Sequence, residues 1–356
     1  MKDLIIMNGN AITGTTFASD LFARFTAYTR VKDTTMKGYE VCLRHFVAWM
    51  HDNGITQPQR EDIVRYANDL DHEISDRTGG TLSAGTRAQY LRAVKHFFKW
   101  TASEGLYPNV GDNIKGAKIK RDNSHKDPLQ EGDVKAVLQS IDRRTTQGKR
   151  NYAIMMLAIT AGLRICEMQT ANVGDIKTVA GEMVLFIQGK GHDEKDDYKK
   201  IVPAVADALR EYLLCRENVK KGDPLFTSTS NRAKDQRITE PGFSRLIKDV
   251  LKGAGYDSDR ITAHSLRHTS VTMLLKAGAT IQEAQTHARH ADPATTEIYA
   301  HNIDKQNSHS EQMIYDHIFS EGITDQQKAQ QLIASMNAAQ AAAVLQFVQT
   351  LKGAAK

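Results

Sequence analysis

Hydrophobic positions recur every three or four residues in four successive stretches near the start of the chain, a period typical of amphipathic helices. We expect helices over residues 18–30 and 35–53, a third that opens at Pro58, and a fourth that is capped by Ser83. The aromatic residues fall on the apolar stripes, which favours packing in a core over base stacking. Residues 17–114 are therefore predicted to form a small all-α domain.

The pattern changes over residues 127–322, where helical stretches surround short β-like segments. Residues 152–161 are almost uniformly apolar and predict a buried helix. Residues 183–188 predict a strand, a tight turn at 189–191 follows, and the chain returns as a second strand over 200–202. The fold class expected is α+β, mostly helical, with a short antiparallel sheet. Further helices are expected over residues 131–141, 204–217, 240–253, 264–277, 280–288 and 293–300.

Residues 323–356 form a C-terminal helical tail with an unusual composition. The 23 residues from 329 to 351 carry no charge, yet eight of them are polar, which makes the stretch too polar to span a membrane. The tail must cover its apolar stripe, either on its own second domain or on a neighbouring copy of the chain. The stripe consists of Ile333, Met336, Val344, Phe347, Val348 and Leu351.

Composition indicates a globular protein. A length of 356 residues suggests two domains, and 40% apolar with 25% charged residues excludes disordered, collagen-like and disulfide-stapled chains. The three cysteines, Cys42, Cys166 and Cys215, include no CxxC pair and fit a reducing compartment. No signal peptide or membrane-spanning stretch is visible. We therefore expect a soluble, cytoplasmic protein.

The net charge of +5 is concentrated in one short segment. Residues 1–114 carry 13 basic and 13 acidic side chains and residues 127–322 carry 26 and 27, whereas the linker 115–126 holds five bases against one acid. This basic linker is either a solvated hinge or a segment that follows a phosphate backbone. In the second case its Lys and Arg side chains would gain affinity by releasing counterions from the phosphates. The candidate DNA-binding bases of the linker are Lys115, Lys118, Lys120, Arg121 and Lys126. Four more, Arg87, Arg92, Lys95 and Lys99, lie off the apolar stripe of a helix and could contact phosphates, although a solvated helix face is the default interpretation.

Three short motifs carry side chains suited to phosphate and proton chemistry. Arg164 follows a glycine that ends the buried helix, so its guanidinium can act as a fixed two-pronged donor, although a helix-end salt bridge is the plainer interpretation. His264 and Arg267 lie three residues apart, on one face of a helix. His290 precedes Tyr299 by nine residues, with a short helix between them.

In combination, these motifs resemble those of the tyrosine site-specific recombinases, also called the phage integrase family. The arginine box of that family reads Thr160-Ala-Gly-Leu-Arg164-Ile-Cys-Glu167 here, and its HxLRHT box spans residues 264–269. Its HxxxxTTxxY box spans residues 290–299, and Lys190 stands in the predicted hairpin turn. The resemblance covers about residues 17–320. It implies a helical core-DNA-binding domain followed by a catalytic domain.

The resemblance also implies a role for each motif residue. Tyr299 would attack the scissile phosphate and store its energy as a 3′-phosphotyrosine. Arg164 and Arg267 would stabilise the charge that builds on the nonbridging oxygens. The remaining expected roles are protonation of the departing 5′-oxygen by Lys190, proton movement at the tyrosine by His264, a hydrogen bond from His290 to a phosphate oxygen, and orientation of Arg164 by Glu167.

One position departs from the family pattern. The family usually has glycine immediately before the second histidine, and this chain has Arg289 there, which puts the role of His290 in doubt and leaves His287 as a weak substitute. A metal site built from the histidines of this region is a disfavoured alternative, because their spacing fits no zinc motif. The turn at residues 189–191 lacks the frame of a nucleotide-binding loop. No metal, ATP or other cofactor is predicted.

We therefore expect an enzyme that recombines double-stranded DNA at inverted-repeat core sites as a homotetramer, integrating or excising a mobile element. The alternatives are chromosome-dimer resolution, a catalytically impaired DNA-binding accessory protein, and a type IB topoisomerase-like relaxing enzyme. Because only about 16 residues precede the helical domain, we expect no separate N-terminal arm-binding domain. Within the tetramer, the resemblance favours exchange of the tail 323–356 between copies.

Overall fold

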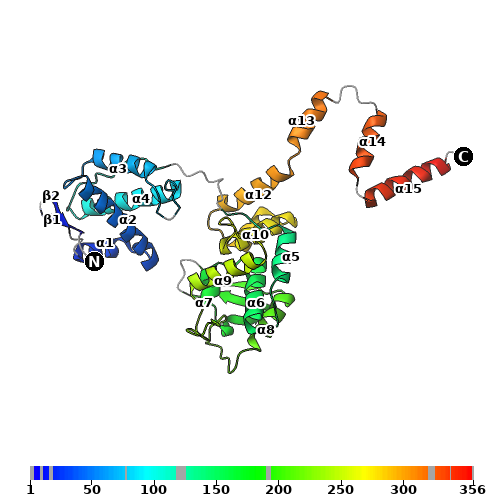
Figure 1. Cartoon of the computed structure of the whole chain (residues 1–356), viewed down its shortest axis with the longest axis horizontal. Helices are drawn as coiled ribbons and strands as arrows, with labels where there is room; N and C mark the ends of the chain where they lie inside the picture. The colour runs from blue at the N-terminus through cyan, green and yellow to red at the C-terminus, as the bar shows by residue number, and fades with distance from the viewer. Residues whose placement is uncertain are drawn as a thin grey trace. The chain divides into compact units, whose positions relative to one another are not determined.

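The chain divides into two compact units, residues 1–123 and 124–356, and Figure 1 follows the chain through both. The predicted fold class, α+β and mostly helical with a short antiparallel sheet, is confirmed. The computed structural model describes residues 4–8, 11–15, 19–76, 78–117, 126–189, 194–319, 325–336 and 338–354.

Four helices form most of the first unit, as the hydrophobic pattern predicts. Ser83 caps the last of them by accepting a hydrogen bond from the backbone N–H of Thr86. The third begins two residues after Pro58, where Gln59 and Asp62 form a capping box. An antiparallel hairpin that the sequence analysis does not predict precedes them. The elements are β1 (Leu4–Asn8), β2 (Ala11–Thr15), α1 (Ser19–Thr29), α2 (Asp33–Asp52), α3 (Arg60–His72) and α4 (Ala84–Ser103).

Aromatic side chains build the core of this unit. Phe25, Tyr66 and Trp100 are fully buried, and the Phe25 ring meets the edge of Phe97 at a centroid distance of 5.6 Å. Burial of each such side chain contributes about 2 kcal/mol to folding. The aromatic stripes thus serve packing, as predicted.

The second unit sets a three-stranded antiparallel sheet, in the order β3-β4-β5, among helices. The return strand runs over Asp197–Lys200 and not over 200–202, because Pro203 already opens the following helix. The strand before the turn ends at Ile187 and pairs there with Asp197. Residues 190 and 191 of the predicted turn lie outside the described residues. The elements up to the sheet are α5 (Glu131–Gln139), α6 (Thr146–Ala161), α7 (Ile165–Thr170), η1 (Val173–Asp175), β3 (Ile176–Val179), β4 (Glu182–Ile187) and β5 (Asp197–Lys200). The later elements are α8 (Pro203–Leu213), α9 (Glu240–Gly253), α10 (Ala263–Lys276), α11 (Ile281–Ala288) and α12 (Ala294–Asn307).

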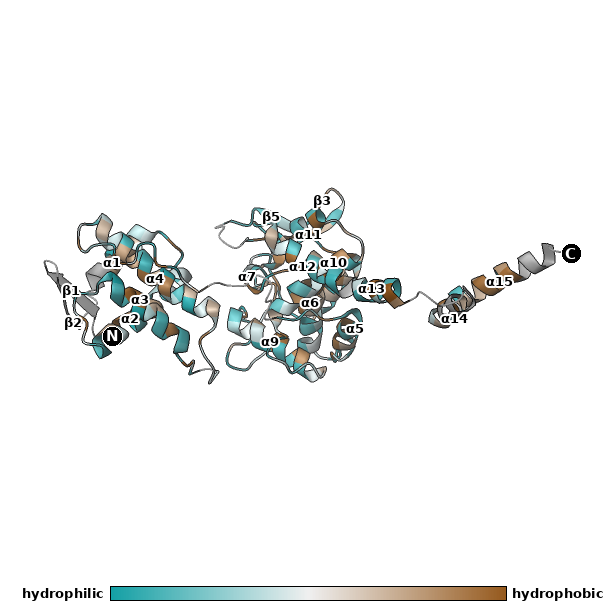
Figure 2. Ribbon diagram, turned by 90° about the horizontal axis from the view of Figure 1, so that it is seen from above, coloured by the Kyte–Doolittle hydropathy of each residue, from teal (hydrophilic) through white to brown (hydrophobic). Residues whose placement is uncertain are grey.

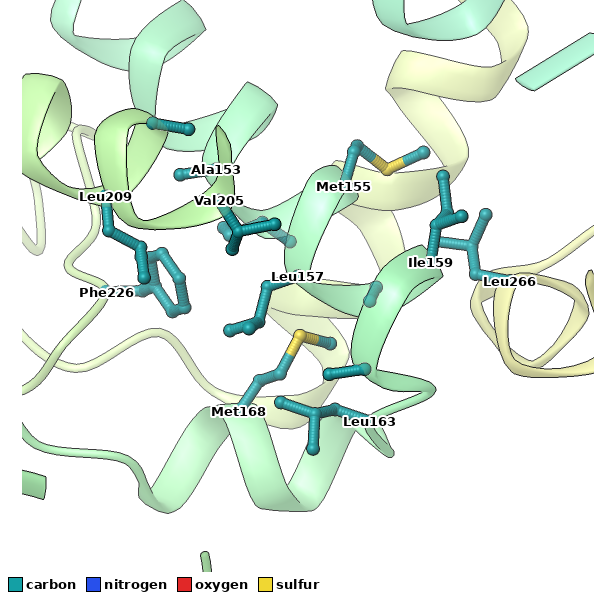
Figure 3. Close-up of a cluster of buried hydrophobic side chains, with 14 of the residues drawn as sticks. Ala153, Met155, Leu157, Ile159, Leu163, Met168, Val205, Leu209, Phe226 and Leu266 are labelled. Carbon is teal, nitrogen blue, oxygen red and sulfur yellow. The ribbon is translucent and has the colours of Figure 1, made fainter. Parts of the chain in front are cut away.

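Helix α6 is the centre of the second unit. Residues 152–161 of this helix are almost uniformly apolar, and the helix packs against α8, α9 and α10. Figure 3 shows Leu157 of α6 among Met168 of α7, Val205 and Leu209 of α8, and Phe226. Because this helix is held on several sides, the residues that follow its C-terminus are placed by a rigid element.

The tail contains two described helices where the sequence analysis expects one continuous stripe. A break at Met336 separates α14 (Asp325–Ser335) from α15 (Ala338–Ala354), and α13 (Ser310–Phe319) precedes both. Large apolar side chains are exposed on these helices: Phe319 is 62% and Phe347 65% exposed. Figure 2 shows the apolar segments of α13 and α15 in brown. Over the described residues, no helix combines the length and the hydropathy that crossing a membrane requires.

Candidate active site

The end of α6 and the start of α7 position the first arginine. Gly162 ends α6 in the left-handed conformation, with φ of +60°, and a Cβ there would lie only 3.0 Å from Nε2 of His287. Arg164 then caps α7. Its backbone N–H donates to Oε2 of Glu167 at 2.8 Å, and its Nη1 donates to Oε1 at 3.0 Å. Because Glu167 is fully buried, its carboxylate fixes both the backbone and the guanidinium of Arg164.

Helix α10 supplies the second arginine. Arg267 is buried, with an exposed fraction of 2%, and its Nη1 donates to the carbonyl of Gly162 at 2.7 Å. Burial and the neighbouring Arg164 lower the pKa of Arg267 to about 10, so the side chain keeps its charge at neutral pH. Two guanidinium groups therefore lie together at the end of α6.

Two histidines one helical turn apart lie beside Arg267. The rings of His264 and His268 are nearly perpendicular, with centroids 4.5 Å apart. The sequence analysis assigns proton movement at the tyrosine to His264, but the hydroxyl of Tyr299 hydrogen-bonds to Nδ1 of His268. Burial, together with the nearby His264, lowers the pKa of His268 to about 4. His268 is therefore a neutral ring at physiological pH, with a nitrogen at the phenol.

Tyr299 of α12 lies half-buried between two histidine rings. Its ring stacks on His290 at an interplanar angle of 15° and a centroid distance of 6.2 Å. Burial raises the pKa of the phenol to about 12, although Arg267 opposes the shift. Nδ1 of His290 hydrogen-bonds to Oγ1 of Thr296 at 2.9 Å, which orients the ring. The phenol is thus protonated at neutral pH and needs a proton acceptor to become a nucleophile.

Arg289 adopts the backbone conformation that a glycine would take at this position. Its φ of +51° is left-handed, and it forms the C-cap of α11. Its Nη2 lies 2.5 Å from Oε2 of Glu167, and its Nε lies 3.6 Å from Oδ2 of Asp197. The turn that holds His290 therefore forms with arginine in place of glycine, and the arginine side chain anchors it to α7.

Three consecutive carbonyl groups at the end of α11 each accept a hydrogen bond from a cation. The last carbonyls of a helix lack intrahelical partners and carry the negative end of its dipole. Such a helix end attracts positive charge. The three pairs are Lys199 Nζ with the carbonyl of His287, Arg267 Nη2 with that of Ala288, and Arg164 Nη2 with that of Arg289 at 3.5 Å.

Two family models match the chain. The model of the phage integrase family matches residues 128–306, and the model of the phage integrase N-terminal SAM-like domain matches residues 22–105. This chain belongs to the phage integrase family. Its members are tyrosine recombinases, and the chain is accordingly an enzyme that cleaves and rejoins DNA through a tyrosine intermediate.

Relatives of the phage integrase family cover most of the chain. "Tyrosine recombinase XerD" from Listeria monocytogenes is 29% identical over 276 residues, which are 75% of this chain and 87% of the relative. The protein of the same name from Oceanobacillus iheyensis is 27% identical over 295 residues, 80% of this chain and 93% of the relative. Both relatives thus span the two units.

Solved structures of this family share the fold. XerH recombinase bound to palindromic difH in a post-cleavage complex matches with a TM-score of 0.63 and 22% identity, over 82% of this chain and 84% of that chain. The Tn1549 transposon integrase in complex with a circular intermediate DNA matches with a TM-score of 0.58 and 18% identity. The match covers 79% of this chain and 93% of that chain. The second unit is therefore the catalytic domain of a phage integrase fold.

The structure brings together five of the six catalytic residues predicted from sequence. Lys190 lies outside the described residues, so its predicted role stays a prediction. Sequence reasoning missed His268 and Lys199 as site residues. The five residues placed together are Arg164, His264, Arg267, His290 and Tyr299.

The predicted DNA-binding bases of the first unit differ in their surroundings. Arg87 pairs with Asp71, and Nζ of Lys95 donates to the carbonyl of Ile114 at 2.7 Å. Arg92 and Lys99 are exposed on α4. These two side chains are therefore the accessible bases of this helix.

The basic linker is described only at its ends. Lys115 is exposed, and Nζ of Lys126 donates to the carbonyl of Asp259 at 2.6 Å. Lys118, Lys120 and Arg121 lie outside the described residues. In the described ranges, no three histidine, cysteine or acidic side chains gather as a metal ion would require.

Proposed function

We propose that this phage integrase family member is a site-specific recombinase in which Tyr299 attacks the scissile phosphodiester. The attack forms a 3′-phosphotyrosine and releases a 5′-hydroxyl, whose proton we assign to Lys190, as the resemblance to the family implies. One observation carries the assignment: the hydroxyl of Tyr299 hydrogen-bonds to His268 beside the buried Arg267. The energy of the broken bond is kept in the covalent intermediate, so rejoining needs no ATP.

The first proton leaves the phenol. His268 has a neutral ring whose Nδ1 already contacts the hydroxyl, so it can accept the proton as the oxygen attacks phosphorus. This assignment replaces His264, whose ring packs on His268. We assign two roles to His264: it stabilises the imidazolium that forms on His268, and it contacts the phosphate.

Charge on the nonbridging oxygens is stabilised by the two arginines. Arg164 is preorganised by Glu167, and Arg267 by the carbonyls of Gly162 and Ala288. Each guanidinium carries five N–H donors in a fixed fork, so donors remain for two phosphate oxygens. Removal of one such donor group commonly costs about 10²–10³ in rate. His290, stacked on Tyr299, adds a hydrogen bond to the phosphate.

The assembly we propose is a homotetramer on two DNA duplexes, each with inverted-repeat core sites. The exposed apolar side chains of α13 and α15 support exchange of the tail between copies, because a large apolar patch on a protomer commonly marks an interaction surface. The basic linker supplies phosphate contacts. As the biological role we propose integration or excision of a mobile element in the cytoplasm, with chromosome-dimer resolution as the alternative.

A catalytically impaired accessory protein is the rival function. Its support in the sequence was Arg289 in place of glycine, but Arg289 takes the left-handed conformation and the next residue, His290, stacks on Tyr299. These two observations support a cleavage-competent site over an impaired one.

The test begins with selection of duplexes bound by the chain from a pool with a randomised core. The selected duplex is then nicked near the cleavage point, so that the released fragment diffuses away and the covalent complex is trapped. We expect a covalent protein–DNA adduct in EDTA without ATP, and joining of two selected sites. Tight binding without an adduct would indicate the accessory protein. Relaxation of supercoiled DNA without joining would indicate a topoisomerase.

A further inference from the structure

Residue 289 holds Arg164 in two ways. Its carbonyl accepts a hydrogen bond from Nη2 of Arg164 at 3.5 Å. Its side chain pairs with Glu167, the same buried carboxylate that accepts a hydrogen bond from Nη1 of Arg164 at 3.0 Å. The preceding carbonyl, that of Ala288, accepts a hydrogen bond from Arg267. The turn over residues 288 and 289 therefore contacts both arginines that we propose to bind the phosphate.

The conformation and the burial of Arg289 are both costly to the fold. Its φ of +51° lies in the left-handed region, which disfavours a residue with a Cβ. Only 16% of its side chain is exposed, and among the described residues its Nε and Nη1 have no hydrogen-bond partner. The carboxylate of Asp197 lies 3.6 Å from Nε, an ion-pair distance that is too long for a hydrogen bond. Glycine would avoid these costs, and such features concentrate at functional sites.

The charges around Glu167 give Arg289 an effect on the site. Arg164 and Glu167 alone would form a neutral pair, whereas Arg164, Glu167 and Arg289 together carry a net charge of +1. Asp197 offsets little of this charge, because its side chain is 46% exposed and is screened by water. Glu167 is fully buried, so its charge is screened far less. With Arg289 paired to Glu167, more of the positive charge of Arg164 is left to act on a phosphate.

The charge of Arg289 also acts on a second cation of the site. The pKa of Lys199 is lowered to about 8, with burial as the main cause and the charge of Arg289 as the next. Lys199 lies on β5 and donates to the carbonyl of His287, two residues before Arg289. The guanidinium of Arg289 is thus close enough to the end of α11 to add to the positive potential there.

We infer that Arg289 is a positioning residue for strand cleavage, which aligns Arg164 and, by neutralising Glu167, strengthens the charge that Arg164 presents to the scissile phosphate. This inference rests on the proposed function. Arg289 acts through Arg164 and makes no contact with the DNA. The glycine usual in the family is therefore not an equivalent residue here: introducing it removes the backbone strain and yet slows cleavage.

Three substitutions of Arg289 separate its charge from its backbone conformation. The rate of adduct formation on the selected, nicked duplex is measured in a single turnover. Arg289→Met keeps a long side chain without charge and should cleave about 10–100-fold more slowly than the unchanged chain, a range typical of partners that orient a functional group. Arg289→Lys should stay within about tenfold of the unchanged chain, because its ammonium can pair with Glu167. Arg289→Gly should be as slow as Arg289→Met, although it lacks the strain.

A double-mutant cycle tests whether Arg289 acts through Arg164. Arg164→Ala should itself be slow, and adding Arg289→Met should change that rate by no more than about twofold, because the guanidinium that Arg289 positions is gone. Arg143→Met is the matched control. It removes an ion pair with Glu211, of 2.7 Å, at the exposed surface, and it should cleave like the unchanged chain.

Binding of the selected duplex shows whether each variant folds. Equal binding by Arg289→Met and the unchanged chain means that the slower cleavage reflects the site. If Arg289→Met binds poorly, Arg289→Gly, which carries no left-handed strain, takes its place in the cycle and in the comparison with Arg289→Lys.

Three outcomes overturn the inference. The first is normal cleavage by Arg289→Met or Arg289→Gly. The second is an Arg289→Lys variant that is as slow as Arg289→Met, and the third is a loss of rate from Arg289→Met that persists in full when Arg164 is absent. Failure of the proposed function looks different, because the unchanged chain then forms no adduct.

Discussion

Arg289 and Glu167 form an ion pair that ties the turn before His290 to the first turn of α7. Nη2 of Arg289 lies 2.5 Å from Oε2 of Glu167, and the other carboxylate oxygen binds Arg164 at 3.0 Å. One fully buried carboxylate thus serves two guanidinium groups from segments more than 120 residues apart. The position of Arg164, which we propose to be catalytic, depends on a residue that family patterns would replace with glycine.

We predict that Arg289→Ala and Arg289→Gly both destabilise the chain, and that alanine is the worse replacement. Each removes the ion pair with Glu167 and leaves the carboxylate with Arg164 alone, a loss of about 1–3 kcal/mol. Alanine also keeps the left-handed strain, which costs about 1 kcal/mol more than glycine. Urea unfolding measures the free energy of unfolding of both variants. Equal stability of the two variants would argue against a left-handed residue 289.

Stability should fall with acid below neutral pH because of three partly buried histidines. Burial lowers the pKa of His268, His287 and His290 to about 4, whereas an unfolded histidine titrates near 6.5. Between these values the unfolded chain binds protons that the folded chain does not, so stability is complete above about pH 6.5 and is lost as pH falls toward 4. Each histidine contributes a slope of at most about 1.4 kcal/mol per pH unit.

His287→Gln provides the matched comparison for this pH dependence. His287 hydrogen-bonds to Ser270 through Nε2 at 2.8 Å, a contact that glutamine can replace. Unfolding free energies at pH 7, 6 and 5 should show a shallower slope in the variant. A slope that matches the unchanged chain would mean that His287 titrates normally in the folded state.

The hydrophobic pattern and the motif spacing predict the parts of the site that regular elements determine. Arg267 follows from a box within one helix, Tyr299 from a box that runs from the turn after α11 into α12, and Arg164 from a glycine that ends a buried helix. The choice between His264 and His268 depends on how α12 packs on α10, which local sequence does not encode. Lys199 was missed because β5 reads Asp-Tyr-Lys-Lys, a polar run without strand periodicity.

The linker should contribute phosphate contacts that do not depend on DNA sequence. Replacement of Lys118, Lys120 and Arg121 by alanine is expected to weaken binding nearly equally on selected and random duplexes. The slope of log K against log salt should decrease by up to about 3, roughly one unit per lost contact. Fluorescence anisotropy at several salt concentrations measures both the affinity for each duplex and the slope. If the slope does not change, the linker is a solvated hinge.

Deletion of residues 324–356 should leave binding to a single site intact and abolish the assembly of two sites. The tail exposes apolar side chains such as Phe347, which is 65% exposed, and contact with a neighbouring copy would cover them. Native gels and an intermolecular recombination assay measure assembly and strand exchange. Phe347→Ser is the milder variant and should weaken assembly in the same direction. A truncated chain that still recombines two sites would assign assembly to another surface.

The most direct test of the account is the covalent bond to Tyr299. The unchanged chain and Tyr299→Phe are incubated with the nicked, labelled duplex and separated by denaturing electrophoresis, and the adduct is digested for peptide mapping. We predict an adduct on the peptide that contains Tyr299 in the unchanged chain, and none with Tyr299→Phe, which should bind the duplex equally well. An adduct that persists in Tyr299→Phe, or that maps to Tyr315 or Tyr256, would contradict the account.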